Sequence, residues 1–125
     1  MWDTLTFNFN KLKTIAGNSI FSNVFSANTA FSTKPSLVIN MPEVTDITAA
    51  TAAAYSWFTG LSTGVEIHLY LPKCTSITNT ILAPGGAHIT YHFGAANQSA
   101  IESTTGYANK WCYNNAANAQ VLFDL

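Results

Sequence analysis

The residues best suited to chemistry in this chain are its three histidines, His68, His88 and His92. Imidazole gains and loses a proton near neutral pH, and it is a common zinc ligand. Two carboxylates, Glu66 and Asp124, occur in segments of the same kind, where polar and apolar residues alternate. A metal or acid–base site built from these five residues is therefore the sharpest chemical hypothesis that the sequence offers.

The alternating segments predict the strands that would position these side chains. In one of them the apolar residues Ile67, Leu69 and Leu71 alternate with polar residues, and a proline follows directly. Such alternation is typical of a strand with one buried face, and proline is tolerated where a strand ends. The pattern recurs along the chain, and its apolar positions form three columns. The columns are Leu5, Leu37, Ile67, Ile89 and Val121; Phe7, Ile39, Leu69, Tyr91 and Phe123; and Phe9, Met41, Leu71, Phe93 and Leu125.

Between these strands, turns and short helices are expected to return the chain to the same edge, which makes the strands parallel. Residues 49–58 contain strong helix formers, and residues 97–103 predict a second helix. Two shorter columns follow the first three strands; they are Leu12, Val44 and Cys74, and Ile15, Ile47 and Ile77. We expect one α/β domain over residues 1–125, with a single parallel sheet of about five strands and with turns and short helices on its other side. Its units are expected to start near residues 4, 36, 66, 88 and 120.

The segment from Leu69 to Ile77 has the form Leu-x-Leu-Pro-x-Cys-x-x-Ile. It resembles a leucine-rich repeat of the irregular bacterial surface-antigen type, the BspA-like class, and residues 9–21 resemble that class too. Residues 1–93 carry the resemblance. Residues 89–125 are similar to the closing segment often found after such repeats, including in phage and prophage structural proteins. The resemblance implies a leucine-rich-repeat-like solenoid that acts in protein or surface recognition, in adhesion or in a larger particle, and it implies no catalytic residues.

The polar residues between the apolar columns are expected to form one outer face of the sheet. Neighbouring strands lie about 4.8 Å apart, which places Glu66 beside His88. The same spacing places His92 between Tyr70 and Asp124. The candidate ligand-binding residues of this face are Glu66, His68, Tyr70, His88, His92 and Asp124.

A polar binding face is a better interpretation of these residues than a metal site. Zinc needs three or four ligands that converge on one point, whereas side chains stand parallel on a flat sheet. The amides of Asn8 and Asn40 fall on the same face and are expected to hydrogen-bond along the sheet. No serine lies in a nucleophile elbow, and Cys74 falls in a core column. We therefore expect no metal, no cofactor and no enzymatic activity.

The two faces of the sheet predict different costs for truncation. Leu69 lies in a core column, so its replacement by alanine is expected to lower the free energy of unfolding by about 2–5 kcal/mol. Thr90 lies between the columns, on the outer face, so its replacement is expected to cost little.

Composition excludes some classes of partner. Charged residues make up 9% of the 125 residues, against roughly 25% in an ordinary domain. The net charge is −1 and arginine is absent, so the chain lacks the basic patch that nucleic-acid binding needs. No apolar run is long enough for membrane insertion, and no signal peptide is recognised, so a location outside the cell or on a particle would require a larger assembly. Cys74 and Cys112 are expected to be free thiols rather than a disulfide.

Two classes of function follow. The first is a non-enzymatic structural or adhesive protein whose partners are other copies of itself or a neighbouring protein subunit. If the strands are ordered as in the sequence, both sheet edges display backbone groups and large apolar residues, which invites pairing with another chain. A head-to-tail contact of this kind does not close and yields a filament. The self-association residues would be Leu5, Phe7, Phe9, Val121, Phe123 and Leu125. The second class is a module that binds a surface glycan or a peptide on the outer face.

Overall fold

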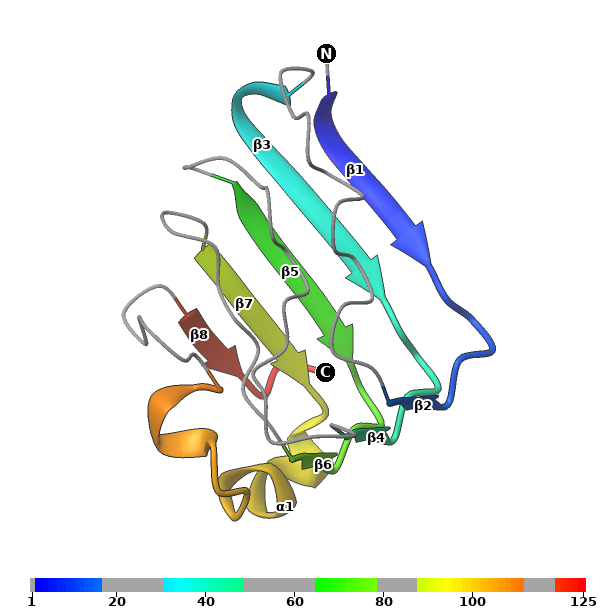
Figure 1. Ribbon diagram of the computed structural model, residues 1–125, viewed down its shortest axis with the longest axis vertical. Coiled ribbons are helices and arrows are strands. Elements are labelled where there is room, and N and C mark those ends of the chain that lie inside the picture. The colour runs from blue at the N-terminus through cyan, green and yellow to red at the C-terminus, as the bar shows by residue number, and fades with distance from the viewer. Residues whose placement is uncertain (1, 17–30, 49–64, 79–87, 112–118) are drawn as a thin grey trace.

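The computed structural model describes residues 2–16, 31–48, 65–78, 88–111 and 119–125. They form an α/β fold with a five-stranded parallel sheet, here called the main sheet, and few helices. The strands of the main sheet are β1 (Trp2–Asn8), β3 (Phe31–Asn40), β5 (Glu66–Leu71), β7 (His88–Phe93) and β8 (Ala119–Leu122). They lie side by side in sequence order, from blue to red in Figure 1. The predicted parallel sheet is therefore confirmed.

A second parallel sheet accompanies the main sheet, although the sequence predicted a single one. Its strands are β2 (Thr14–Ile15), β4 (Asp46–Ile47) and β6 (Ser76–Ile77), in this order. It lies at the lower end of the molecule in Figure 1, where the first three main strands turn. Each turn has a backbone bond of 3.3–3.4 Å between an amide and the carbonyl three residues earlier; the pairs are Leu12 to Phe9, Val44 to Met41 and Cys74 to Leu71. The same turn, used three times, carries the predicted column of Ile15, Ile47 and Ile77 into the second sheet.

The apolar columns of the first four main strands pair as predicted. In one column Phe7 lies opposite Ile39, Ile39 lies opposite Leu69, and Leu69 lies opposite Tyr91. The column members in β3, β5 and β7 are fully buried. These three strands therefore supply the centre of the core.

The predicted register of β8 is wrong by two residues. Tyr91 lies opposite Val121 and Ile89 lies opposite Ala119, whereas the sequence columns pair Ile89 with Val121. Side chains alternate between the faces with a period of two, so a slip of two residues leaves every side chain on its own face. The alternation alone cannot distinguish the two registers.

Burial of the apolar columns falls off at both edges of the main sheet. Leu5 and Phe7 of β1 are only partly buried, whereas their neighbours in β3, Leu37 and Ile39, are fully buried. The edge residues that pack against the core but stay partly exposed are Leu5, Phe7, Phe9, Val121 and Phe123. Both ends of the columns are thus incompletely covered.

A helical segment closes one end of the second sheet. It consists of η2 (Ala95–Asn97), α1 (Gln98–Glu102) and η3 (Tyr107–Asn109), and α1 confirms the helix predicted within residues 97–103. Helix α1 lies beside β6 at the bottom of Figure 1. The expectation of open edges concerns the main sheet, and there β1 and β8 are the edge strands. The helix predicted at residues 49–58 lies outside the described residues.

Trp111 fixes the closing segment to the core. Its indole is fully buried and packs edge-on against Tyr91 and Phe93, with ring centroids 5.1 and 5.7 Å away. Its ring N–H donates to the Thr104 hydroxyl at 3.2 Å. A Cβ atom at Gly106 would lie 2.4 Å from Cδ1 of this indole, so only glycine fits there.

Candidate functional site

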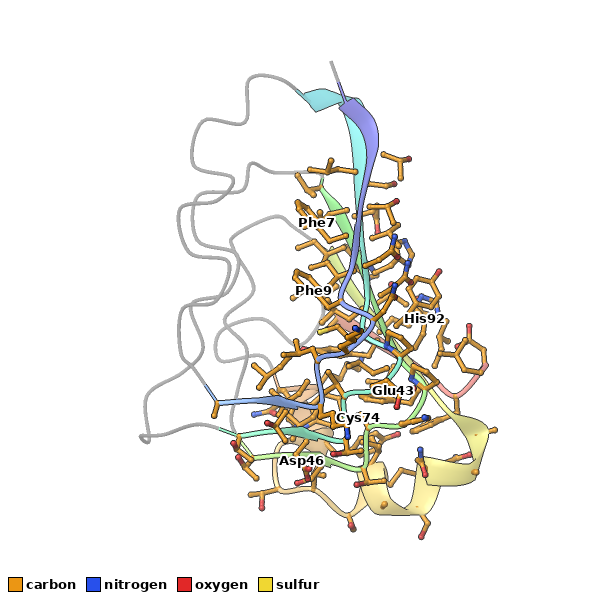
Figure 2. All side chains as sticks on the ribbon, turned by 90° about the vertical axis from the view of Figure 1, so that its right-hand side faces the viewer. Phe7, Phe9, Glu43, Asp46, Cys74 and His92 are labelled. Carbon is orange, nitrogen blue, oxygen red and sulfur yellow. The ribbon has the colours of Figure 1, made fainter. Side chains whose placement is uncertain are left out.

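Polar residues of β5 and β7 share one face of the main sheet, the predicted outer face. Along β5, Glu66, His68 and Tyr70 alternate with fully buried residues. His92 of β7 lies on the same face, whereas Phe7 projects from the opposite face of the sheet (Figure 2). The sheet therefore places these polar side chains together, as the sequence pattern indicates.

His68, His92 and Asp124 form a continuous hydrogen-bonded chain on this face. Nδ1 of His92 lies 2.9 Å from Oδ2 of Asp124, and Nε2 of His92 lies 3.0 Å from Nδ1 of His68. A carboxylate can only accept, so the Nδ1–H group of His92 donates to Asp124. With both rings neutral, Nε2 of His92 then accepts the Nδ1–H group of His68. We call these three residues the histidine chain.

The sequence predicted one contact of the histidine chain and missed the other. The neighbourhood of His92 and Asp124 is confirmed, although the backbone partner of His92 is Leu122 rather than Asp124. The contact between His68 and His92 was missed because their strands pair His68 with Thr90. Diagonal neighbours on adjacent strands are within reach of long side chains, and that rule is the signal that could have found it.

The protonation of the histidine chain is constrained by its geometry. If both rings were charged, both facing nitrogens would carry a proton and the 3.0 Å bond between His68 and His92 would be lost. Burial, and next the neighbouring His92, lower the pKa of His68 below its ordinary value of 6.5. A neutral His68 is therefore favoured at neutral pH.

Glu66 and His88 form a separate pair at the beginning of β5 and β7. Oε2 of Glu66 lies 3.1 Å from Nδ1 of His88, so the predicted contact is confirmed. Both side chains are well exposed, and solvent screens a pair of this kind strongly. The six candidate residues thus divide into this exposed pair and a group around His92.

Tyr70 stacks on His92 and lines a pocket that opens to solvent. The two ring centroids are 4.2 Å apart, and the ring planes differ by 4°. The pocket has a volume of about 320 Å³. Part of its lining is apolar and comes from Met41, Pro42 and Pro72.

Asn8 and Asn40 supply the polar part of the same pocket. Nδ2 of Asn40 donates to Oδ1 of Asn8 at 2.7 Å, as the sequence predicts. Each amide keeps further hydrogen-bonding capacity: Asn8 retains its N–H donors and Asn40 retains its carbonyl oxygen. The pocket therefore offers both a donor and an acceptor.

Leu125 also lines the pocket, whereas the sequence columns predicted a core position for it. Its amide donates to the carbonyl of Phe93 at 3.2 Å, and its carbonyl accepts from the amide of Ala95 at 2.9 Å. Its side chain is 45% exposed, so its assignment to a core column is wrong. The two backbone bonds, with the bond from His92 to Asp124, hold this segment against the end of β7.

Thr90 lies between the apolar columns, as predicted, but is buried. It lies between His68 and Gln120 in the sheet and is only 4% exposed. That the replacement of Thr90 by alanine costs little stability stays a prediction.

Cys74 is a free, buried thiol, as predicted. Burial raises its pKa to about 12, and its Sγ lies 3.5 Å from the carbonyl oxygen of Ser76. Only a thiolate is strongly nucleophilic, so Cys74 is poorly suited to catalysis. Cys112 lies outside the described residues.

Within the described ranges, no group of three or more His, Cys, Asp or Glu side chains is arranged to hold a metal ion. Within the described residues, the hydrogen-bonding partners of the three histidine side chains are another histidine or a carboxylate, and none is a hydroxyl or a thiol. The site is thus built for hydrogen bonding and ring contacts.

Comparisons of the chain with models of protein families, with curated proteins and with solved structures found no match. No helix among the described residues combines the length and the apolar character needed to cross a bilayer. The features of the chain that bear on its function are the edges of the main sheet and the outer face.

Proposed function

We propose that this chain is a leucine-rich-repeat-like solenoid module with a structural or adhesive role, and that it works by head-to-tail association of its sheet edges rather than by catalysis. The partial burial of the edge columns carries this proposal. Leu5 and Phe7 at one edge and Val121 and Phe123 at the other stay partly exposed, whereas the column members between them are fully buried. A neighbouring copy would complete the columns at both ends.

The parallel order of the strands supports a contact between unlike edges. Because β1 and β8 run in the same direction, β8 of one copy can lie beside β1 of the next and continue the main sheet. Such a heterologous contact leaves the outer edges of the pair free and therefore propagates. Helix α1 lies beside β6, so the contact would be made by the main sheet alone.

Low charge favours this association. Only 9% of the residues are charged and the net charge is −1, so repulsion between copies is weak. The exposed apolar surface at the edges would be removed from water, at roughly 25 cal/mol for each Å² buried.

Complementary edge variants test the proposal. Phe7→Glu blocks the β1 edge and Phe123→Glu blocks the β8 edge, while Thr6→Glu places the same charge on the exposed outer side of β1. Sedimentation velocity and electron microscopy should show concentration-dependent oligomers for the native chain and for Thr6→Glu, and monomers for each edge variant alone. An equimolar mixture of the two edge variants should form a one-to-one dimer, because each contributes its intact edge.

Two results would count against head-to-tail association. A native chain that stays monomeric at every micromolar concentration overturns it directly. A Phe123→Glu variant that still dimerises would show a symmetric contact between two β1 edges instead. Circular dichroism of each variant checks that the fold is kept.

A second proposed function is the binding of a glycan or a peptide on the outer face. The pocket beside Tyr70 favours it, because the pocket combines an aromatic ring with amide groups that retain hydrogen-bonding capacity. This function is compatible with adhesion, since the pocket lies on the face of the sheet and the association proposal uses its edges.

A further inference from the structure

We infer that the pocket beside Tyr70 binds one ring of an uncharged sugar, so that the ligand of the outer face is a neutral glycan. The inference rests on the second proposed function, ligand binding at the outer face, and names the class of ligand. It is carried by the size of the pocket, by a lining without charged side chains, and by the arrangement of one aromatic ring and two amides.

Size and charge restrict the ligand first. The volume of about 320 Å³ is at the low end of the roughly 300–1,000 Å³ of small-molecule sites, so the pocket suits a single ring. No lining residue carries a charged side chain. A charged ligand would lose hydration there without a charged side chain in the lining to pair with, which favours a neutral polar molecule.

Tyr70 provides the surface on which a sugar ring can stack. One face of its ring is covered by His92 at a centroid distance of 4.2 Å. On its other side Tyr70 neighbours Asn40 of β3, its partner in the sheet, and the two side chains line the pocket together. The C–H groups on one face of a pyranose are apolar and pack against such an aromatic face.

The histidine chain fixes the orientation of this aromatic surface. Asp124 holds His92 at 2.9 Å, and His68 holds its other nitrogen at 3.0 Å. The stacked ring of Tyr70 is therefore ordered before a ligand arrives. Preorganisation of this kind lowers the entropy lost on binding.

The two asparagines complete the match to a sugar. Asn8 retains N–H donors and Asn40 retains a carbonyl acceptor beside their mutual 2.7 Å bond. Neighbouring hydroxyl groups of a sugar donate and accept at once, so they can satisfy both amides. An extended peptide would instead pair with a strand edge, and this pocket lies on the face of the sheet.

Titration of the isotope-labelled chain with neutral monosaccharides, followed by NMR, tests the inference. Glucose, galactose, mannose and N-acetylglucosamine are added separately, and the side-chain amide signals of Asn8 and Asn40 are the readout. At least one sugar should shift both signals in a saturable manner. Tyr70→Ala should lower the affinity for that sugar about tenfold. Tyr70→Phe keeps the ring, so its affinity should stay within about twofold of that of the native chain.

Thr6→Ala is the matched control, because it truncates an exposed residue on the outer side of β1 that does not line the pocket. It should leave the affinity unchanged. Asn40→Asp, which replaces the amide of Asn40 with a carboxylate of the same shape, should reduce binding. Thermal melting of each variant confirms that the fold persists.

The outcomes separate the ligand class from the proposed function. Glucuronate that binds as tightly as glucose would overturn the inference of an uncharged ligand. If N-acetyl-trialanine amide shifts the two amide signals and no sugar does, the glycan class is wrong while ligand binding at the outer face stands. If neither kind of probe shifts them, both are wrong.

Discussion

Leu5 and Leu37 provide a matched test of which strand ends the main sheet. They are the same residue type, they lie directly opposite each other, and they belong to one apolar column. Leu37 has a strand on each side and is fully buried, whereas Leu5 lies in the edge strand and is partly buried. Replacement of each by alanine therefore removes the same atoms from two environments that differ mainly in their outward neighbour.

The structure sets different magnitudes for the two replacements. Leu37→Ala leaves a cavity between strands that are held on both sides, so we expect a loss of about 3–5 kcal/mol in the free energy of unfolding. Full burial of a leucine side chain is worth roughly 1.5–3 kcal/mol. Leu5 realises only part of this and its site opens to solvent, so we expect Leu5→Ala to cost about 1 kcal/mol.

Urea unfolding, followed by far-ultraviolet circular dichroism at a concentration where sedimentation shows only monomer, measures both losses of unfolding free energy. Unchanged slopes of the unfolding free energy against urea confirm that the two variants unfold from comparable states. Equal losses for Leu5→Ala and Leu37→Ala would refute the reasoning, because they would mean that Leu5 is as fully enclosed as Leu37.

The same pair of variants reports on association. If the β1 edge pairs with another copy, the unfolding midpoint of the native chain rises with protein concentration. Leu5→Ala weakens the contact and should flatten this dependence, whereas Leu37→Ala should keep it. A midpoint of the native chain that does not change with concentration would contradict the proposed association.

Three further predictions concern single groups. The pKa of His68 is lower in the folded chain than its ordinary 6.5, so between these two values the unfolded chain binds more protons than the folded chain. The contribution of His68 to the unfolding free energy is therefore fully present above pH 6.5 and is lost as the pH falls toward the folded pKa. The urea midpoint of His68→Gln should fall less over this range than that of the native chain. A Cβ atom at Gly94 would lie 2.4 Å from the carbonyl oxygen of Pro72, so Gly94→Ala should lower the unfolding free energy by about 1–3 kcal/mol, and an unchanged urea midpoint would contradict this contact. In a Cys112→Ser background, Cys74, whose pKa is raised to about 12, should react with a thiol reagent at pH 8 only after unfolding; fast labelling of the native chain would show that it is accessible.

Much of the main sheet was determined by the sequence. Period-two alternation identified the faces of β1, β3, β5 and β7, and the columns through Leu69 pair as expected. The register of the first three strands is fixed by pairing in both sheets, because each strand continues through the same turn into the second sheet. The contacts of Asn8 with Asn40 and of Glu66 with His88 follow from that register.

Tertiary structure decided what the alternation leaves open. For β8 the period-two pattern allowed a slip of two residues, and the structure places Ala119, rather than Val121, opposite Ile89. Leu125 lies beyond the end of β8, where its backbone bonds to Phe93 and Ala95 place it at the pocket rather than in a core column. The contact of His68 with His92 and the position of α1 beside β6 likewise depend on groups that meet only after the strands and the closing segment pack together. A repeat of polar and apolar residues specifies faces, because burial distinguishes them, but it does not distinguish one position from the next along the same face.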